Sequence, residues 1–141
     1  MSAFSGARIR AVRVLTQGPP AFPGMARALD NLHVRTRENT VRRQLLFSAG
    51  DTLDTLAVAE SIRRLRRLRY LRDVELSGVR CGSGPVDLAL TTLDDWSVKP
   101  KLQVRSGGRS ELAVTERNLL GSGRELTLHA RTQQGRVGVG F

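Results

Sequence analysis

The sequence predicts an α+β fold, in which a two-layer β-α-α-β-β unit is followed by short antiparallel strands. Two stretches carry this prediction. Residues 55–71 contain no proline or glycine, and they place apolar side chains at helical spacing. Residues 86–91 alternate apolar and polar side chains, which is typical of a strand in a sheet that is covered on one face only. Two helices on one face of such a sheet make a two-layer unit.

The first strand is predicted at residues 9–15, which are rich in β-branched side chains and precede a proline-containing turn. Val12 and Val14 share one parity along this strand, whereas Ile9 has the other. Because alternate residues of a strand point to opposite faces, the register at the start of the strand stays open.

A long connection with three prolines follows at residues 17–35, and we expect a short helix within it at residues 25–32. We interpret His33 as structural, because no cysteine or second histidine lies near it. Cys81 is the only cysteine, so no internal disulfide can form.

Two helices are predicted next. The first covers residues 37–47, with Thr36 as its N-cap, and the second covers residues 55–71, with Asp54 as its N-cap. The short connection between them favours an antiparallel pair. The outer face of the second helix is basic, with Arg63, Arg64, Arg66, Arg67 and Arg69.

Two strands complete the unit, at residues 73–76 and 86–91, and a glycine- and proline-containing turn at residues 82–85 separates them. The second strand alternates strictly and presents three apolar side chains on one face: Val86, Leu88 and Leu90.

The pattern changes after residue 93. Short alternating segments follow one another, separated by turn clusters, at residues 98–104, 112–114, 126–130 and 137–141. This pattern is typical of antiparallel barrels, including those that cross membranes. Four strands are too few to close a barrel, so we expect either a small sheet or the beginning of a larger barrel.

The chain carries a formal net charge of +10. Residues 1–80 contain 15 Lys and Arg against 7 Asp and Glu (15 − 7 = +8), so most of the charge belongs to the first unit. A basic surface binds polyanions such as nucleic acid, anionic lipid or an acidic protein, although many such surfaces are only solvated. A basic nucleic-acid-binding module is therefore an alternative hypothesis, but aromatic residues are only 4% of the chain, which disfavours base stacking.

Enzymatic activity is not expected. Asp94 and Asp95 are adjacent, so in a strand they point to opposite faces and do not form an acid–base pair. The glycine-containing turn at residues 121–123 precedes a strand rather than a helix, unlike a phosphate-binding loop. We predict no catalytic residues, no metal site and no cofactor.

Four local motifs resemble a known family when they are taken together and in order. They are LHVRTR with VRRQLLF and GD (residues 32–37, 41–47 and 50–51), AES with LRRLRYLRDV (59–61 and 65–74), VDL with DDWSVKP (86–88 and 94–100), and ERNLLGSG (116–123). This arrangement resembles the POTRA (polypeptide-transport-associated) domain and first barrel strands of outer-membrane barrel-assembly proteins of the Bam/Tam type.

The resemblance implies a POTRA-like domain at residues 6–95 and the first strands of an outer-membrane β-barrel at residues 96–141. Because most of such a barrel would follow, we interpret the chain as a piece of a longer protein. The resemblance also implies a bacterial outer-membrane location, with the POTRA-like domain in the periplasm. The implied partners are unfolded outer-membrane protein clients, other POTRA domains or assembly lipoproteins, and membrane lipid; no nucleic acid is expected.

Three sets of site residues follow from this resemblance. We expect client strands to pair by β-augmentation with an edge strand formed by Asp73, Val74, Glu75, Leu76, Ser77, Gly78 and Val79. The junction between domain and barrel is expected at Asp95, Trp96 and Pro100, with Trp96 as an anchor at the water–lipid interface. The first barrel hairpin is expected to turn through Glu116, Asn118, Leu120, Gly121 and Gly123.

Overall fold

The computed structural model describes residues 4–20, 34–80, 82–105, 109–133 and 136–141. The helix expected at residues 25–32, His33 and Cys81 lie outside this part of the chain. The elements are β1 (Ile9–Gln17), α2 (Glu38–Arg42), α3 (Thr55–Arg66), β2 (Leu71–Arg80), β3 (Val86–Asp94), β4 (Val98–Arg105), β5 (Arg109–Glu116), η2 (Leu119–Gly121), β6 (Leu126–Gln133) and β7 (Arg136–Gly140).

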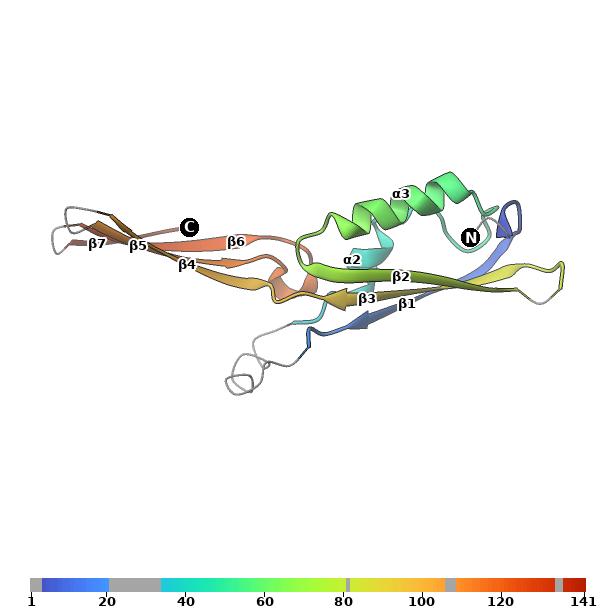
Figure 1. The fold of residues 1–141 in the computed structure, drawn as a ribbon, viewed down its shortest axis with the longest axis horizontal. Helices are drawn as coiled ribbons and strands as arrows, with labels where there is room; N and C mark the ends of the chain where they lie inside the picture. The colour runs from blue at the N-terminus through green and yellow to red at the C-terminus, as the bar shows by residue number, and fades with distance from the viewer. Residues whose placement is uncertain (1–3, 21–33, 81, 106–108, 134–135) are drawn as a thin grey trace.

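Two sheets lie end to end, and α3 lies across one face of the first (Figure 1). The first sheet has the order β1-β3-β2, in which β1 is parallel and β2 antiparallel to the central strand β3. The second sheet is antiparallel, with the order β4-β5-β6-β7. The predicted α+β class, a β-α-α-β-β unit followed by antiparallel strands, is therefore confirmed.

The central strand β3 carries most of the core. Val86, Leu88 and Leu90 are all at most 1% exposed, and they face the helices as the alternation predicted. On β1, a register shift between Ile9 and Ala11 explains the change of parity seen in the sequence. Because the bulge adds one residue to β1, Ile9 and Val12 both point into the same core cluster despite their different parity.

The helix α3 begins where the sequence predicted. The Asp54 side chain accepts a hydrogen bond from the Leu56 backbone amide at 2.9 Å. The predicted end at residue 71 is wrong, because α3 stops at Arg66 and Leu71 already belongs to β2. The reason is tertiary: Tyr70 and Leu71 are buried in the sheet core, and Leu71 pairs with Asp94 of β3. The helix is thus about 18 Å long.

We expect Asp54→Ala to lower the stability of the chain by about 1 kcal/mol, since the substitution leaves the Leu56 amide without its side-chain acceptor. Urea denaturation followed by circular dichroism measures this loss. Asp54→Ser is the matched control and is expected to retain most of the stability, because serine also caps helices well. Equal losses for both variants would contradict the capping role.

The helix α2 is shorter than predicted. It spans Glu38–Arg42 instead of residues 37–47, and Arg37 rather than Thr36 is its N-cap. The chain leaves the helix because the Leu46 amide donates to the Ser61 hydroxyl oxygen at 2.8 Å, a partner on α3. A contact with another element therefore replaces the intrahelical hydrogen bond that the local pattern favours.

Candidate functional site: the junction of the two sheets

The turn between β5 and β6 docks onto the first unit. The Gly121 carbonyl oxygen accepts hydrogen bonds from the Arg37 amide and the Thr40 hydroxyl, both at 2.9 Å. Gly121 has a φ of +70°, and a Cβ atom added there would lie 2.3 Å from the Arg35 carbonyl oxygen. Only glycine fits this contact, because the conformation is left-handed and the neighbouring atom is backbone.

A network of buried polar groups connects three segments that are far apart in the sequence. The Asn118 side-chain nitrogen donates a hydrogen bond to the Thr36 hydroxyl oxygen at 2.8 Å. The Asn118 side-chain oxygen accepts one from the Gly123 backbone amide at 2.9 Å. The Thr36 backbone amide donates to the Asp94 carboxylate at 2.7 Å. Asn118, Thr36 and Asp94 are each at most 2% exposed. Buried polar groups that are mutually hydrogen-bonded define one arrangement of the segments that carry them.

Tyr70 forms the other wall of this junction. A Cβ atom at Gly123 would lie 2.6 Å from the Tyr70 hydroxyl oxygen, so the ring and the turn are in close contact. The Tyr70 carbonyl oxygen accepts from the Asp95 amide at 2.9 Å, which ties the α3–β2 loop to the link between the sheets. Burial, followed by the nearby Asp94 carboxylate, raises the pKa of the Tyr70 phenol above its usual value.

The residues predicted for the junction lie in or next to the link between β3 and β4. The Asp95 carboxylate accepts from the Lys99 ammonium at 3.2 Å, and Trp96 is half-buried. Pro100 lies in β4 and is exposed. Asp94 is buried whereas Asp95 is partly exposed, so the two carboxylates occupy different environments as expected from their adjacency. The role of Trp96 as an interfacial anchor stays a prediction.

The residues predicted for the hairpin turn lie together. The Glu116 carboxylate accepts a hydrogen bond from the Asn118 backbone amide at 2.7 Å, which closes the turn at the end of β5. Leu120 has a φ of +54° and is 60% exposed. Sequence reasoning missed the docking partners of this turn, Thr36, Thr40 and Tyr70. Thr36 and Tyr70 do occur in the sequence motifs that resemble the POTRA family, but the motifs do not indicate that these residues contact the turn between β5 and β6.

The predicted client-binding strand, β2, lies at an edge of the first sheet, because among the described strands it pairs with β3 alone. A groove of about 650 Å³ separates it from α3 and is lined by apolar side chains such as Val58, Ile62 and Leu76. The Val74 amide donates to the Asp73 carboxylate at 2.8 Å, and the Val74 carbonyl oxygen accepts from the Arg66 guanidinium at 3.3 Å. Side chains of the same chain therefore already occupy both backbone groups of Val74.

The strand geometry indicates which backbone groups of β2 stay open. Both groups of Val74 have partners other than β3, so they point away from the sheet. Alternate residues of an antiparallel edge strand point the same way. No register shift interrupts β2 from residue 73 to residue 80, so Leu76 and Gly78 also direct their backbone groups outward.

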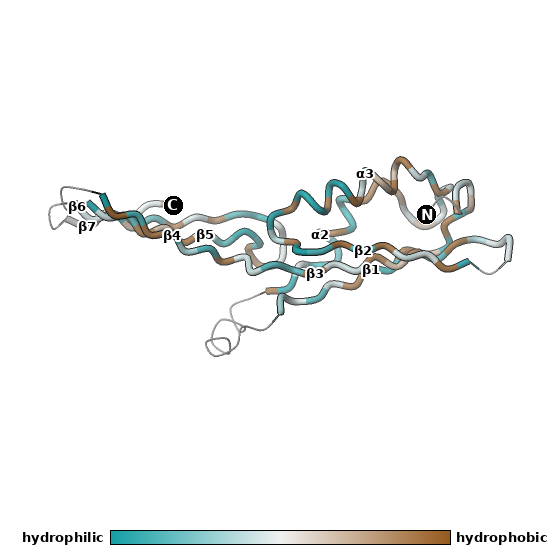
Figure 2. Tube along the Cα trace, viewed as in Figure 1, coloured by the Kyte–Doolittle hydropathy of each residue, from teal (hydrophilic) through white to brown (hydrophobic). Residues whose placement is uncertain are grey.

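The second sheet has one apolar and one polar face. The register pairs Leu102 with Leu112, Leu112 with Ala130, and Ala130 with Val139, so the predicted alternations of all four strands coincide. Hydrophobic and hydrophilic residues alternate along these strands (Figure 2), and the apolar face is strongly exposed, with Val104 at 76% and Val139 at 80%. We call it the apolar band; it comprises Pro100, Leu102, Val104, Leu112, Val114, Leu128, Ala130, Val137 and Val139.

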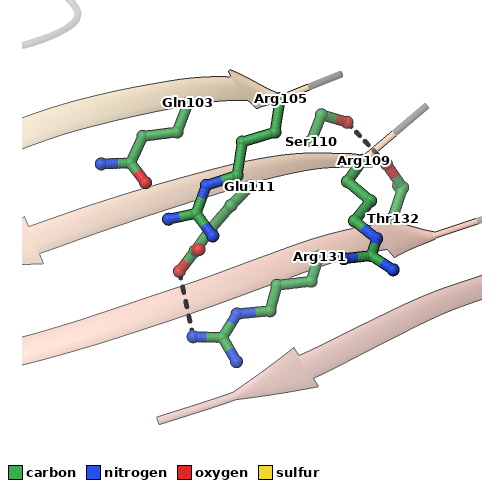
Figure 3. Close-up of a pocket in the computed structure, with 7 residues that line it drawn as sticks. All are labelled: Gln103, Arg105, Arg109, Ser110, Glu111, Arg131 and Thr132. Atoms are coloured by element: carbon green, nitrogen blue, oxygen red, sulfur yellow. Dashed lines mark hydrogen bonds and ion pairs between the residues drawn. The ribbon is translucent and has the colours of Figure 1, made fainter. Parts of the chain in front are cut away.

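The opposite face of this sheet is polar and mainly basic. The Glu111 carboxylate accepts from Arg131 at 3.2 Å and contacts the His129 ring nitrogen at 3.1 Å. Figure 3 shows Arg105, from the neighbouring strand β4, beside this carboxylate, and Arg109, from β5 itself, at the same hollow of about 330 Å³.

None of the described residues gather into a group of three or more His, Cys, Asp and Glu side chains suited to a metal ion. The helices among the described residues are too short and too polar to cross a membrane.

Comparisons with known proteins bear on the fold. No family model matches the chain, and neither does any curated protein. The solved structure of BamA from Haemophilus ducreyi, lacking POTRA domains 1–3, is similar with a TM-score of 0.68 and 22% identity, over 94% of this chain and 23% of that one. CdiB from Acinetobacter baumannii is similar with a TM-score of 0.52 and 15% identity, over 89% of this chain and 22% of that one.

The chain therefore spans less than a quarter of either solved protein. At these identities the likeness establishes the arrangement of helices and strands. It confirms, at the level of the fold, the resemblance that the four sequence motifs indicated: this chain folds as the matching part of BamA does.

Proposed function

We propose that the chain is the membrane-proximal POTRA domain, residues 6–95, and the first barrel strands, residues 96–141, of a bacterial outer-membrane protein. The protein assembles or translocates other proteins at that membrane and is not an enzyme. The likeness to BamA and CdiB supports this proposal, as does the order of the two sheets along one chain.

The apolar band supports the membrane assignment. A sheet in water buries its apolar face against a second layer, but here side chains such as Leu102, Val104 and Val137 are about 70% exposed. Barrel strands in lipid alternate in this manner, with apolar residues outward and polar residues toward the lumen. The polar face with Glu111 and Arg131 then lines the interior of the barrel.

We further propose that the domain binds unfolded client polypeptides at β2 by β-augmentation. The observation that carries this is the outward direction of the backbone groups at Leu76 and Gly78, beside the apolar groove under α3. Backbone hydrogen bonds capture an extended strand with little regard to sequence, and the groove accepts alternate side chains. The capped groups of Val74 limit the docking segment to the part of β2 that follows it.

Gly78→Pro tests this mode. Proline removes the outward amide of Gly78, and it is tolerated at sheet edges because that amide does not pair within the sheet. Each lost hydrogen bond is worth about 1 kcal/mol or more, so we expect affinity for a client strand to fall by about 10-fold. The probe is a fluorescent ten-residue peptide of alternating valine and threonine, and binding to the full chain in detergent is followed by anisotropy.

Gly78→Ala is the matched control. A Cβ atom at this position approaches the Phe4 ring at 3.1 Å in both variants, whereas the amide is lost only in the proline variant. We expect Gly78→Ala to bind the peptide as the unmodified chain does. If the proline variant retains full affinity while folded, the peptide binds elsewhere and the assignment to β2 is wrong.

A further inference from the structure

Three arginines follow α3 at the end of the domain that faces the second sheet. Arg67 is the C-cap of α3, Arg69 follows it in the loop, and Arg72 is the second residue of β2. All three side chains are exposed. We call them the basal arginines.

The basal arginines differ from those earlier on the helix. Arg63 and Arg64 both contact the Glu60 carboxylate, and Arg42 on α2 contacts Glu38. Within the described ranges of the chain, no carboxylate lies within ion-pair distance of Arg67, Arg69 or Arg72. Arg63 and Arg64 are therefore paired with a carboxylate on the helix, whereas the basal arginines at its end are paired with none that the structure describes.

The position of the basal arginines relative to the apolar band follows from Tyr70. This residue lies between Arg69 and the strand that holds Arg72, and its hydroxyl touches Gly123. Gly123 precedes Leu126, the first residue of β6, by three residues, or at most about 10 Å of extended chain, and Leu126 lies two residues before Leu128 on the face of the apolar band. In Figure 1 the end of α3 that leads into this loop lies next to the start of the second sheet, and Figure 2 shows the same end as hydrophilic.

We propose that the basal arginines bind the anionic phospholipid headgroups of the leaflet in which the base of the second sheet lies. This inference rests on the proposed function, since the apolar band defines where the hydrocarbon begins. The headgroup layer, which contains the phosphates, extends about 5–8 Å beyond that boundary, and the guanidinium group binds phosphate oxygens with paired hydrogen bonds. Together with the docked turn between β5 and β6, this contact fixes the orientation of the domain relative to the membrane surface.

The expected effect is substantial and depends on salt. One basic residue near an anionic membrane surface increases binding by about 5-fold, so three together contribute about 100-fold at low ionic strength. The gain falls as salt is added, because the Debye length shortens from about 30 Å at 0.01 M to about 10 Å at 0.1 M.

The experiment compares vesicles of phosphatidylcholine with vesicles that also contain phosphatidylglycerol. The full chain is transferred from detergent, and its bound fraction is measured by flotation at low and high salt. We expect a preference for the anionic vesicles that the triple variant R67Q/R69Q/R72Q loses by at least 10-fold. The control R8Q/R13Q/R80Q removes the same charge from exposed arginines just before β1, on β1 and on β2, away from the junction, and is expected to keep the preference.

The outcomes separate the two proposals. If the triple variant keeps the full preference for anionic vesicles while the chain binds both kinds, the basal arginines are not the headgroup site. An equal loss in the control would mean that net charge alone acts and would also overturn the inference. If the unmodified chain fails to bind even neutral vesicles, the apolar band does not enter lipid, and the membrane assignment itself is wrong.

Discussion

Gly121→Ala is expected to detach the turn between β5 and β6 from the domain. The added methyl group would stand 2.3 Å from the Arg35 carbonyl oxygen, which is backbone and has no side-chain freedom to move aside. The left-handed conformation costs alanine about 1–2 kcal/mol. The two hydrogen bonds to the Gly121 carbonyl are worth about 1 kcal/mol each. We therefore expect the docked arrangement to lose about 3–4 kcal/mol.

Hydrogen exchange measures this detachment directly. The Arg37 amide donates to Gly121, so its protection should fall by at least 100-fold in the variant, while amides of β3 keep theirs. Gly82→Ala is the matched control, since Gly82 also has a positive φ, of +60°, but has open space around it. It separates backbone strain from the steric clash. Unchanged protection at Arg37 in the Gly121 variant would show that the turn does not depend on this contact.

Asn118→Ala is expected to have the second-largest effect. The substitution removes the hydrogen bonds to Thr36 and Gly123 and leaves their buried partners unpaired. Each unpaired buried group costs about 1–3 kcal/mol, so we expect a loss of about 2–4 kcal/mol. Thermal denaturation of the full chain in detergent, followed at Trp96 in the link between the sheets, measures this loss.

A double-mutant cycle with Thr36→Val tests the coupling between the two residues. Valine keeps the shape of threonine without the hydroxyl, so the second substitution should cost less in the Asn118→Ala background than alone. The expected coupling is about 1 kcal/mol or more. Strictly additive losses would show that the Asn118–Thr36 contact does not hold the junction together.

The docked turn has a consequence for the proposed function. The first unit and the second sheet are joined covalently only by the link at residues 95–97. The hydrogen bonds of Gly121 and Asn118 add a second attachment, through residues that follow the link by more than 20 positions. Two separate attachments restrict rotation of one unit relative to the other. The open edge of β2 is thereby held in a defined direction relative to the second sheet.

Local patterns in the sequence were sufficient for most of the secondary structure. The alternation of apolar and polar residues predicted β3 and the four strands after it, together with their apolar faces. Successive side chains of a strand point to opposite faces, so this alternation matches a strand and not a helix. The N-cap of α3 was predicted correctly because Asp54 accepts its hydrogen bond from the first turn of the helix that it caps, and no distant residue is involved. The motifs also indicated the fold, which the likeness to BamA confirms.

Elements whose ends depend on distant partners were predicted less well. The helix α2 ends early because Ser61 takes the Leu46 amide, and α3 ends early because Leu71 pairs with Asp94. Thr36 has the chemistry of a helix cap, yet it is used by Asn118 and Asp94, 82 and 58 residues away. Propensity along the chain carries no information about such partners.

The class of fold, the alternation that forms the apolar band, the basic outer face of the second helix and the glycine-containing turn were all predictable from the sequence, because each depends on residues close together in the chain. The contacts of Gly121 with Arg35 and of Asn118 with Thr36 depend on tertiary packing instead. Those contacts arise when packing brings two sheets end to end, and their hydrogen bonds then select one arrangement among many that satisfy the local pattern equally well.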